Sequence, residues 1–354
     1  FTFKLISYIV EIQRGKIEPS RDFVAFSTYI AFFPTILSGP IDKPNTFIPQ
    51  LQKKRSFDYD LAVDGCRQIL WGLFQKVVIA DNLAVVINNV WGDIPNQTGS
   101  TLFIIAILYS FQIYTDFSGY SHMAIGVGKL LGFHITKNFN YPYFSRNIAE
   151  FWRNWHISLT SWVTEYVFMP LNIKFRNFGN LGIILAIIIN LVVVGIWHGA
   201  NWTFAVFGLY NGLLFIPLIL SGSFFKKKKL KTNKYGLPTI TDFSKMIGTF
   251  LFVTIGLVIF RAENISQFWQ YISGIFDFPL SSFGSFGVSG ISIPPIIFTV
   301  VLFALEWIYK DSEYPLAKLG TKWKRPIRYA MYYTFIIIIF WLGGKEQQFI
   351  YFQF

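Results

Sequence analysis

The chain of 354 residues is 53% hydrophobic and only 14% charged, whereas soluble domains usually carry about 25% charged residues. Aromatic residues reach 19%, which excludes an intrinsically disordered chain. The single cysteine excludes a disulfide scaffold or a cysteine-based zinc cluster. The 31 Lys and Arg against 19 Asp and Glu give a net charge of +12. The composition therefore predicts a protein that crosses a membrane several times.

Stretches without Asp, Glu, Lys or Arg locate the predicted membrane helices. In chain order they are 23–41, 94–115, 177–225, 246–260, 278–305 and 329–344. A helix needs about 20 residues to cross a bilayer core of roughly 30 Å, so the 49 residues of 177–225 have room for two helices. The runs 246–260 and 329–344 are short for a full span, which favours a locally thinned bilayer or a re-entrant segment.

We expect an all-α, polytopic fold of transmembrane and re-entrant helices, because backbone groups in lipid must be paired internally and the runs do not alternate as β-barrel strands do. No internal repeat and no Pro/Ser-rich linker divides the chain, so residues 1–354 are expected to form a single membrane-embedded domain. The sequence begins at Phe1 in what resembles the end of a helix, and we expect the complete protein to have further N-terminal helices. The glycines of 282–290 predict a flexible loop.

Basic residues cluster between the apolar runs. The clusters are Lys53–Arg55, Lys226–Lys229 with Lys231 and Lys234, and the four basic residues of Lys322–Arg328. Short loops rich in Lys and Arg remain on the cytoplasmic side of a membrane. No aromatic or groove-reading context accompanies the clusters, so we interpret the charge as topology and not as a nucleic-acid site.

The reaction motifs of common soluble enzymes are missing, including the nucleophile elbow, the P-loop and the HExxH zinc motif. The glycines of Gly126–Gly132 miss the dinucleotide fingerprint by one position and predict a helix surface for close packing. Cys66 has no neighbouring histidine, which disfavours a thiolate nucleophile.

The segment Phe151–Leu171 predicts an interfacial or re-entrant helix. At 100° per residue its aromatic side chains Trp152, Trp155, Trp162 and Tyr166 fall on one face, and His156 lies at the edge of that face. Aromatic rings of this kind favour the boundary between water and lipid. Composition alone favours an aromatic anchor with a structurally hydrogen-bonded histidine.

His198 lies within the longest charge-free run, in the sequence Gly195–Trp202. An ionisable residue inside a membrane is costly, which makes it a functional candidate. Asn190, in the same run, is expected to join two helices. Asp116, at the end of the run 94–115, is expected to pair with a basic residue such as Arg146 or Arg153.

Several motifs together resemble the membrane-bound O-acyltransferases, in the branch that contains alginate O-acetyltransferase and the teichoic-acid D-alanyl transfer protein. The motifs occur in the expected order from near Phe1 to the last residue: Phe32–Pro34 with Ser38–Ile41, Asp116–Ser121 with Met123–Gly126, Asn138–Tyr143, Glu150–Leu159, Trp197–Gly199 and Phe349–Phe354. The chain departs from the branch at His122, where an acidic residue is usual, at Thr164-Glu165, where Arg-Asp is usual, and at Asn172-Ile173, where paired glycines are usual.

The resemblance implies that His198 is catalytic and that His156 is the second, branch-specific histidine. It implies acyl transfer from a thioester to a hydroxyl, with a histidine as base and with donors for the developing oxyanion from groups such as Asn201 and Trp197. Trp155, Asp116 and Arg153 are expected to support the site. We expect no bound cofactor and no metal; acetyl-CoA or an acyl-carrier thioester is the expected donor.

The resulting hypothesis is transfer of a small acyl group, acetyl first, across a bacterial cytoplasmic membrane to an extracytoplasmic polysaccharide or partner protein. D-alanyl transfer to teichoic acid from a carrier protein is the alternative within the family. A transporter with a histidine-lined proton path is the alternative outside it, although the paired halves of many transporters are not visible. Expected partners are membrane lipid, the donor and an extracytoplasmic protein that binds the polymer.

Overall fold

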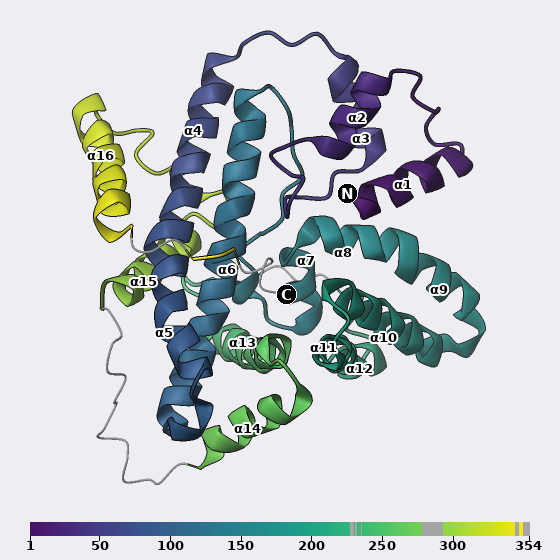
Figure 1. Cartoon of the computed structure of the whole chain (residues 1–354), viewed down its shortest axis with the longest axis vertical. Coiled ribbons are helices and arrows are strands. Elements are labelled where there is room, and N and C mark those ends of the chain that lie inside the picture. Colours follow the sequence, from purple (N-terminus) through teal and green to yellow (C-terminus); the bar gives the residue numbers. More distant parts are fainter. Residues whose placement is uncertain (227–229, 231, 235, 278–292, 344–346, 350–354) are drawn as a thin grey trace.

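The computed structural model describes residues 1–226, 230, 232–234, 236–277, 293–343 and 347–349. These residues form helices, and apart from an isolated bridge between Thr232 and Pro238 they form no strand (Figure 1). The α-helices are α1 Thr2–Gln13, α2 Phe23–Ala31, α3 Pro44–Gln52, α4 Tyr59–Leu73, α5 Asp81–Trp91, α6 Gly99–Leu130, α7 Ile148–Asn154, α8 Ile157–Val163, α9 Met169–Lys174, α10 Gly179–His198, α11 Trp202–Leu213, α12 Ile216–Leu220, α13 Ile240–Arg261, α14 Ile265–Phe276, α15 Ile293–Ile308 and α16 Arg325–Leu342.

Five helical segments in the described residues are long and apolar enough to cross a membrane: Tyr59–Trp91, Gly99–Leu130, Arg176–His198, Trp202–Leu220 and Ile240–Arg261. The all-α membrane fold predicted from composition is therefore confirmed. The run 246–260 is part of a 22-residue helix, α13, so the expectation that it is too short for a span is wrong. The helix is longer than the run because it also includes residues 240–245 before the run and Arg261 after it.

The segment Tyr59–Trp91 escaped the search for charge-free runs because it contains charged side chains. The structure pairs several of them inside the protein. Lys76 lies in η1 (Phe74–Ala80), a π-helical turn, and its Nζ is 2.7 Å from both Asp81 Oδ1 and Asp116 Oδ1. Asp116 therefore pairs with Lys76, and the expected pairing with Arg146 or Arg153 is wrong. Arg146 instead binds Glu150, with 2.7 Å between Nη2 and Oε1.

Helices α4 and α6 pack backbone against backbone at the centre of the molecule. A Cβ atom added at Gly126 would lie 2.6 Å from the carbonyl oxygen of Gly65, and one at Gly119 would lie 2.7 Å from that of Gly72. No side chain larger than hydrogen fits these two contacts without a backbone shift. The prediction that the glycines near Gly126 form a close-packing surface is confirmed.

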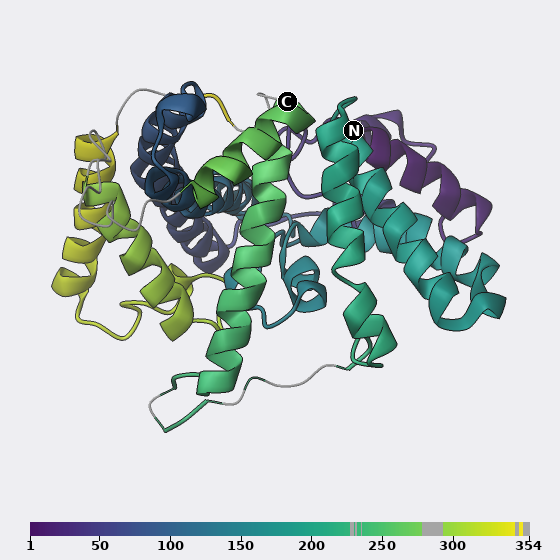
Figure 2. The same cartoon turned by 90° about the horizontal axis from the view of Figure 1, so that it is seen from below.

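Helices α10, α11 and α12 form a hairpin from the longest charge-free run, as predicted. The turn 199–201 reverses the chain, so that His198 at the end of α10 and the loop after α12 lie at opposite ends of this hairpin. Figure 2 shows α13 rising from the lower part of the view toward the level of the N-terminus.

The stretch Phe151–Leu171 is not one helix, contrary to the prediction. It divides into α7, α8, the π-helical turn η4 (Thr164–Phe168) and α9, which follow an arc in Figure 1. The break falls at His156, whose φ of 44° and ψ of 54° are left-handed. A left-handed residue cannot continue a right-handed helix, so α7 ends before His156 and α8 begins after it.

The first charge-free run does not form a span. It contains α2, which ends at Ala31, and a turn through Pro34 that leads into the loop Ser38–Ile41. Proline removes backbone donors and ends a helix, which explains why a run of 19 apolar or neutral residues (23–41) yields a helix of only 9 residues. The predicted flexible loop at 282–290 lies outside the described residues.

Candidate functional site

His156 and His198, the two histidines singled out in the sequence, line one cavity of about 290 Å³. Besides His156, four parts of the chain form its wall: the first turn of α1 with Phe1–Lys4, the loop Thr35–Ile41, Phe117 of α6, and Trp197 with His198. The wall mixes polar and apolar groups. Two imidazoles that open into one space can serve as a proton acceptor and as a hydrogen-bond donor for the same reactants.

His156 is buried, with 3% of its surface exposed, and lies between α7 and α8. Its ring packs edge-on against Phe117, with 4.6 Å between the ring centroids, and is 6.2 Å from the ring of Trp197. The side chain does not cap α8 although His156 is the N-cap residue of that helix. The imidazole therefore faces the cavity instead of the helix terminus.

His198 is the last residue of α10 and is half-buried. Its ring contacts Trp197, at 4.7 Å between centroids, and stands perpendicular to Phe260 of α13, at 4.9 Å. Aromatic rings thus contact the imidazole on two sides, and the imidazole also lines the cavity.

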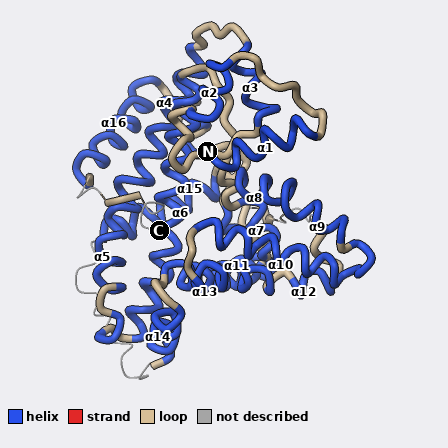
Figure 3. The backbone as a smooth tube through the Cα atoms, turned by 45° about the vertical axis from the view of Figure 1, so that its right-hand side comes forward, coloured by secondary structure: helices blue, strands red, loops and turns tan. Residues whose placement is uncertain are grey.

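Trp197 lies between the two histidines and stacks on Phe3, with 5.4 Å between ring centroids. Phe3 also stacks on Trp162 at 4.0 Å, and the Trp162 indole donates to the carbonyl oxygen of Phe3 at 3.0 Å. Figure 3 shows α1 beside α8, as these contacts require. The start of α1 is therefore part of the cavity wall, which nothing in its sequence had indicated.

The remaining predicted site residues lie around this cavity and do not line it. Asn201 accepts from the Thr203 backbone N–H at 3.1 Å and donates to the Glu263 carbonyl at 2.7 Å, so its side chain caps α11. Trp155, next to His156, packs within a cluster of aromatic rings. Asp116 binds Lys76. These residues can support the residues that line the cavity, but they do not line it themselves.

Arg153 lines a second cavity of about 300 Å³, which is mainly apolar and lies between α8 and α10. The guanidinium donates to the carbonyl oxygens of Ala149 and Phe224, at 2.9 and 3.5 Å. Asn190 lines the same cavity, and its buried side-chain oxygen has no hydrogen-bond partner among the described residues. Asn190 was expected to join two helices, but its oxygen accepts no hydrogen bond from another helix in the described part of the chain.

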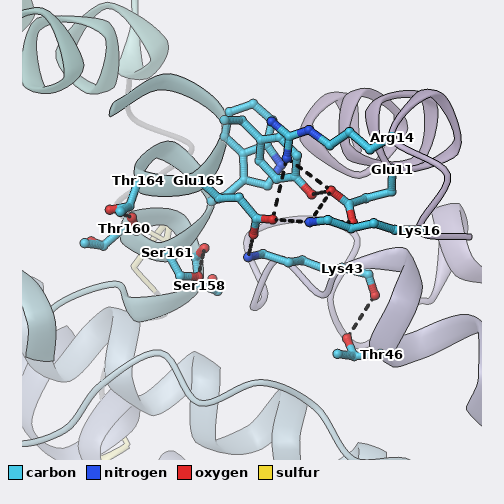
Figure 4. A network of polar contacts seen from close by, with 12 residues as sticks. Glu11, Arg14, Lys16, Lys43, Thr46, Ser158, Thr160, Ser161, Thr164 and Glu165 are labelled. Atoms are coloured by element: carbon cyan, nitrogen blue, oxygen red, sulfur yellow. Dashed lines mark hydrogen bonds and ion pairs between the residues drawn. The ribbon is translucent and has the colours of Figure 1, made fainter. Parts of the chain in front are cut away.

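A charged network near the end of α8, which Figure 4 shows, was not predicted from the sequence. Glu165 of η4 binds Lys16, with 3.0 Å between Oε1 and Nζ, and also binds Lys43. Glu11 of α1 binds Lys16 at 3.2 Å and accepts from the Tyr166 hydroxyl at 3.0 Å. The network joins α1, the start of α3 and η4. Its signal in the sequence was the carboxylate retained at Glu165.

No group of three or more His, Cys, Asp or Glu in the described part of the chain is placed to hold a metal ion. The residues of the cavity are instead those of acid–base chemistry.

Comparison with known proteins places this site in a family. The model of the membrane-bound O-acyltransferase family matches residues 18–258. The probable alginate O-acetylase of Pseudomonas aeruginosa is 32% identical over 329 residues, which cover 91% of this chain and 60% of that protein. The peptidoglycan O-acetyltransferase of Helicobacter pylori is 33% identical, covering 72% of this chain and 46% of that protein.

The teichoic acid D-alanyltransferase of Bacillus subtilis is 32% identical over 281 residues, which cover 74% of this chain and 67% of that protein. The chain thus spans about three fifths of the length of the alginate-type relatives. Both histidines of the cavity lie within the residues that the family model matches. With an all-helical membrane fold and a match over more than half of its length, this chain belongs to the membrane-bound O-acyltransferase family.

Proposed function

We propose that the protein transfers a small acyl group, acetyl first, from a thioester to a hydroxyl of a cell-envelope polymer or of a partner protein. The observation that carries the proposal is the meeting of His156 and His198 in one cavity although 41 residues separate them in the chain. The names of the relatives, two O-acetylating and one D-alanylating, support an ester-forming reaction.

The proposed reaction needs no acyl-enzyme. His198 removes the proton from the acceptor hydroxyl as its oxygen attacks the thioester carbonyl carbon. His156 donates a hydrogen bond to the carbonyl oxygen as negative charge develops there, an interaction of about 3 kcal/mol for one well-placed donor. The carbon–sulfur bond then breaks, the thiolate leaves, and the proton held by His198 returns to the sulfur. The products are the ester and the free thiol.

The test is thioester cleavage by the purified full-length protein in lipid nanodiscs. With acetyl-CoA and a hydroxyl acceptor, the wild-type protein is expected to release free CoA thiol and to acetylate the acceptor. His198→Ala should lower the rate at least about 100-fold, because a lost general base typically costs 10² to 10⁴. Retention of more than about a tenth of the activity would contradict the assigned role. Insertion of the variant into membranes is the control.

The same assay separates the alternatives. Turnover with a D-alanyl carrier thioester and not with acetyl-CoA would support the D-alanyl function, as in the Bacillus subtilis relative. Proton flux in sealed vesicles without thioester cleavage would support a transporter. We place the protein in the bacterial cytoplasmic membrane, with the acceptor on the outer side.

We further propose that a separate extracytoplasmic protein presents the polymer. The described part of the chain contains no sizeable hydrophilic domain: its segments outside the helices are short. Deletion of such a partner should abolish polymer acylation in cells while the protein still cleaves its thioester. Full-rate polymer acylation by the purified protein alone would exclude the partner.

A further inference from the structure

Asn138 is fully buried in the segment between α6 and α7 and forms hydrogen bonds with the residues that follow His156. Its backbone carbonyl accepts from the Ile157 N–H at 2.8 Å. Its side-chain oxygen accepts from the Ser158 N–H at 3.3 Å and from the Ser158 hydroxyl at 2.6 Å. One residue thus satisfies the first two backbone N–H groups of α8.

This arrangement replaces the usual helix cap. The side chain of the N-cap residue normally accepts from the N–H of the second or third residue of the helix, but that of His156 does not. Because Asn138 supplies both acceptors from another part of the chain, the imidazole of His156 is left to face the cavity.

The left-handed backbone of His156 requires such support. A non-glycine residue with positive φ is uncommon, because the left-handed conformation brings Cβ too close to the following carbonyl oxygen. Only two non-glycine residues in the described part of the chain have positive φ, namely His156 and Tyr141. Between Asn138 and Tyr141, the Asn140 N–H also donates to the Asn154 carbonyl, at 3.0 Å. The segments 138–141 and 154–158 therefore hold each other in shape.

The contacts of Asn138 continue to the cavity wall. The hydroxyl of Ser158 accepts from the backbone N–H of Ile41 at 2.9 Å, and Ile41 belongs to the loop that lines the cavity. The side-chain amide of Asn138 donates to the Ser121 hydroxyl of α6 at 3.2 Å. Asn138 thereby connects α6, the start of α8 and the loop 35–41.

We propose that Asn138 is a positioning residue, which holds His156 in its left-handed conformation and so directs the imidazole toward the space it shares with His198. Asn138 does not line that cavity, and it acts on the reaction through His156 and the loop at Ile41. This inference rests on the proposed acyl transfer for its kinetic consequence, but not for its structural one.

The kinetic test is a double-mutant cycle between Asn138→Ala and His156→Ala. Alone, Asn138→Ala should lower kcat at least about 10-fold with little change in the KM for the thioester, because small displacements of a catalytic group are costly. In the His156→Ala background it should cause no further loss. A full, additive loss in that background would show that Asn138 does not act through His156. Asn140→Ala is the matched control, since Asn140 is exposed and its side chain bonds Asn154 and Lys137.

Ser158→Ala provides a second variant if Asn138→Ala fails to fold. It removes the 2.6 Å contact that orients the Asn138 side chain and leaves the backbone bonds in place. Its loss in kcat should be smaller and should also vanish in the His156→Ala background. Additivity here would likewise overturn the proposal.

A structural test is independent of activity. Diethyl pyrocarbonate modifies imidazoles, and mass spectrometry measures the rate separately for His156 and His198. Asn138→Ala should change the rate at His156 severalfold and leave that at His198 unchanged, whereas Asn140→Ala should change neither. Identical rates in wild type and Asn138→Ala would overturn the proposal. If the wild-type protein cleaves no thioester, the proposed function fails, and this measurement still decides on Asn138.

Discussion

At the scale of single residues, the different roles proposed for the two histidines match the difference between their backbone conformations. His198 ends a transmembrane helix between aromatic rings, whereas His156 occupies a strained conformation fixed by the hydrogen bonds of Asn138 to α8. Strained residues persist where the surrounding structure determines them, and they gather at functional sites. A rigid His156 suits a group that orients or polarises the thioester carbonyl.

This assignment predicts that the two substitutions of His156 are unequal. His156→Gln retains a side-chain N–H donor and should keep measurable thioester cleavage, whereas His156→Ala removes the donor and should lose about 10²-fold or more. Initial rates with acetyl-CoA measure both variants. Equal losses in the two variants would show that proton transfer, and not hydrogen bonding, is the role of His156.

The sequence led to the two histidines and to Trp197, and not to the rest of the cavity as a site. His198 stands out as an ionisable residue in an apolar run, and both histidines lie in motifs of the family. Phe3 and the loop Thr35–Ile41 are more than 100 residues away from them. Ser38–Ile41 belongs to a motif of the family, but neither segment has an acid, a base or a nucleophile that would assign it to the site. Asn138 could be found only once its contacts to α8 were known, because an asparagine in a loop has many possible roles.

At the scale of elements, the network around Glu165 connects α1 to η4 and so supports the wall at Phe3. Burial acts to raise the pKa of Glu165, but the hydrogen bonds and charges of Lys43 and Lys16 outweigh it, so that the pKa lies below its ordinary value of 4.5. A carboxylate with a lowered folded-state pKa stabilises the fold above its unfolded pKa. That contribution is lost as the pH falls through the folded pKa.

Acid should therefore weaken the wild-type protein more than Glu165→Gln. Between pH 6 and pH 3.5 the melting temperature in detergent should fall by roughly 2 °C more in the wild type, which is the size expected for a half-exposed ion pair. Thermal unfolding followed by circular dichroism measures the difference. Parallel pH curves for the two proteins would mean that Glu165 contributes nothing to stability.

A second element-scale prediction concerns the ion triad that joins η1, α5 and α6. Lys76→Met leaves Asp81 and Asp116 buried together without a cation, whereas Asp116→Asn leaves Lys76 its contact with Asp81. Breaking a buried pair costs about 3–5 kcal/mol, and Lys76→Met should approach that range while Asp116→Asn costs less. Unfolding in detergent ranks the variants, and the reverse order would contradict the triad.

Local sequence could not have produced the triad or the span that contains it. A charge-free window is not a necessary sign of a membrane helix, because charges that pair inside the protein are tolerated there. The segment Tyr59–Trp91 is such a case. By contrast, α10 and α11 contain no Asp, Glu, Lys or Arg and were predicted correctly.

At the scale of the whole molecule, two hydrogen bonds join segments that are far apart in the sequence. The Trp307 indole at the end of α15 donates to the carbonyl of Gly236, in the loop that follows Lys226, at 3.2 Å. The Tyr314 hydroxyl, further along the chain, donates to Asp64 near the start of α4 at 2.5 Å. Gly236 therefore lies beside the end of α15, and the segment that follows α15 lies beside the first turns of α4. The Lys and Arg residues near these segments remain the basis for expecting a cytoplasmic side there.

The Lys and Arg bias predicts that the loop before α13 faces the cytoplasm, and this orientation can be tested at that loop. Cysteine at Ser223 or Thr232, in a Cys66→Ser background, should resist a membrane-impermeant thiol reagent in intact cells and react after permeabilisation. Cysteine at Ala200, in the turn at the other end of the α10–α11 hairpin, is the matched control and should react from outside if that turn is open to solvent there. Because the loop and His198 lie at opposite ends of this hairpin, protection of the loop puts His198 toward the outer side, where the proposed acceptor is. Ready labelling of Ser223→Cys in intact cells would invert the protein in the membrane, and the acceptor would then have to reach the histidines from the cytoplasm.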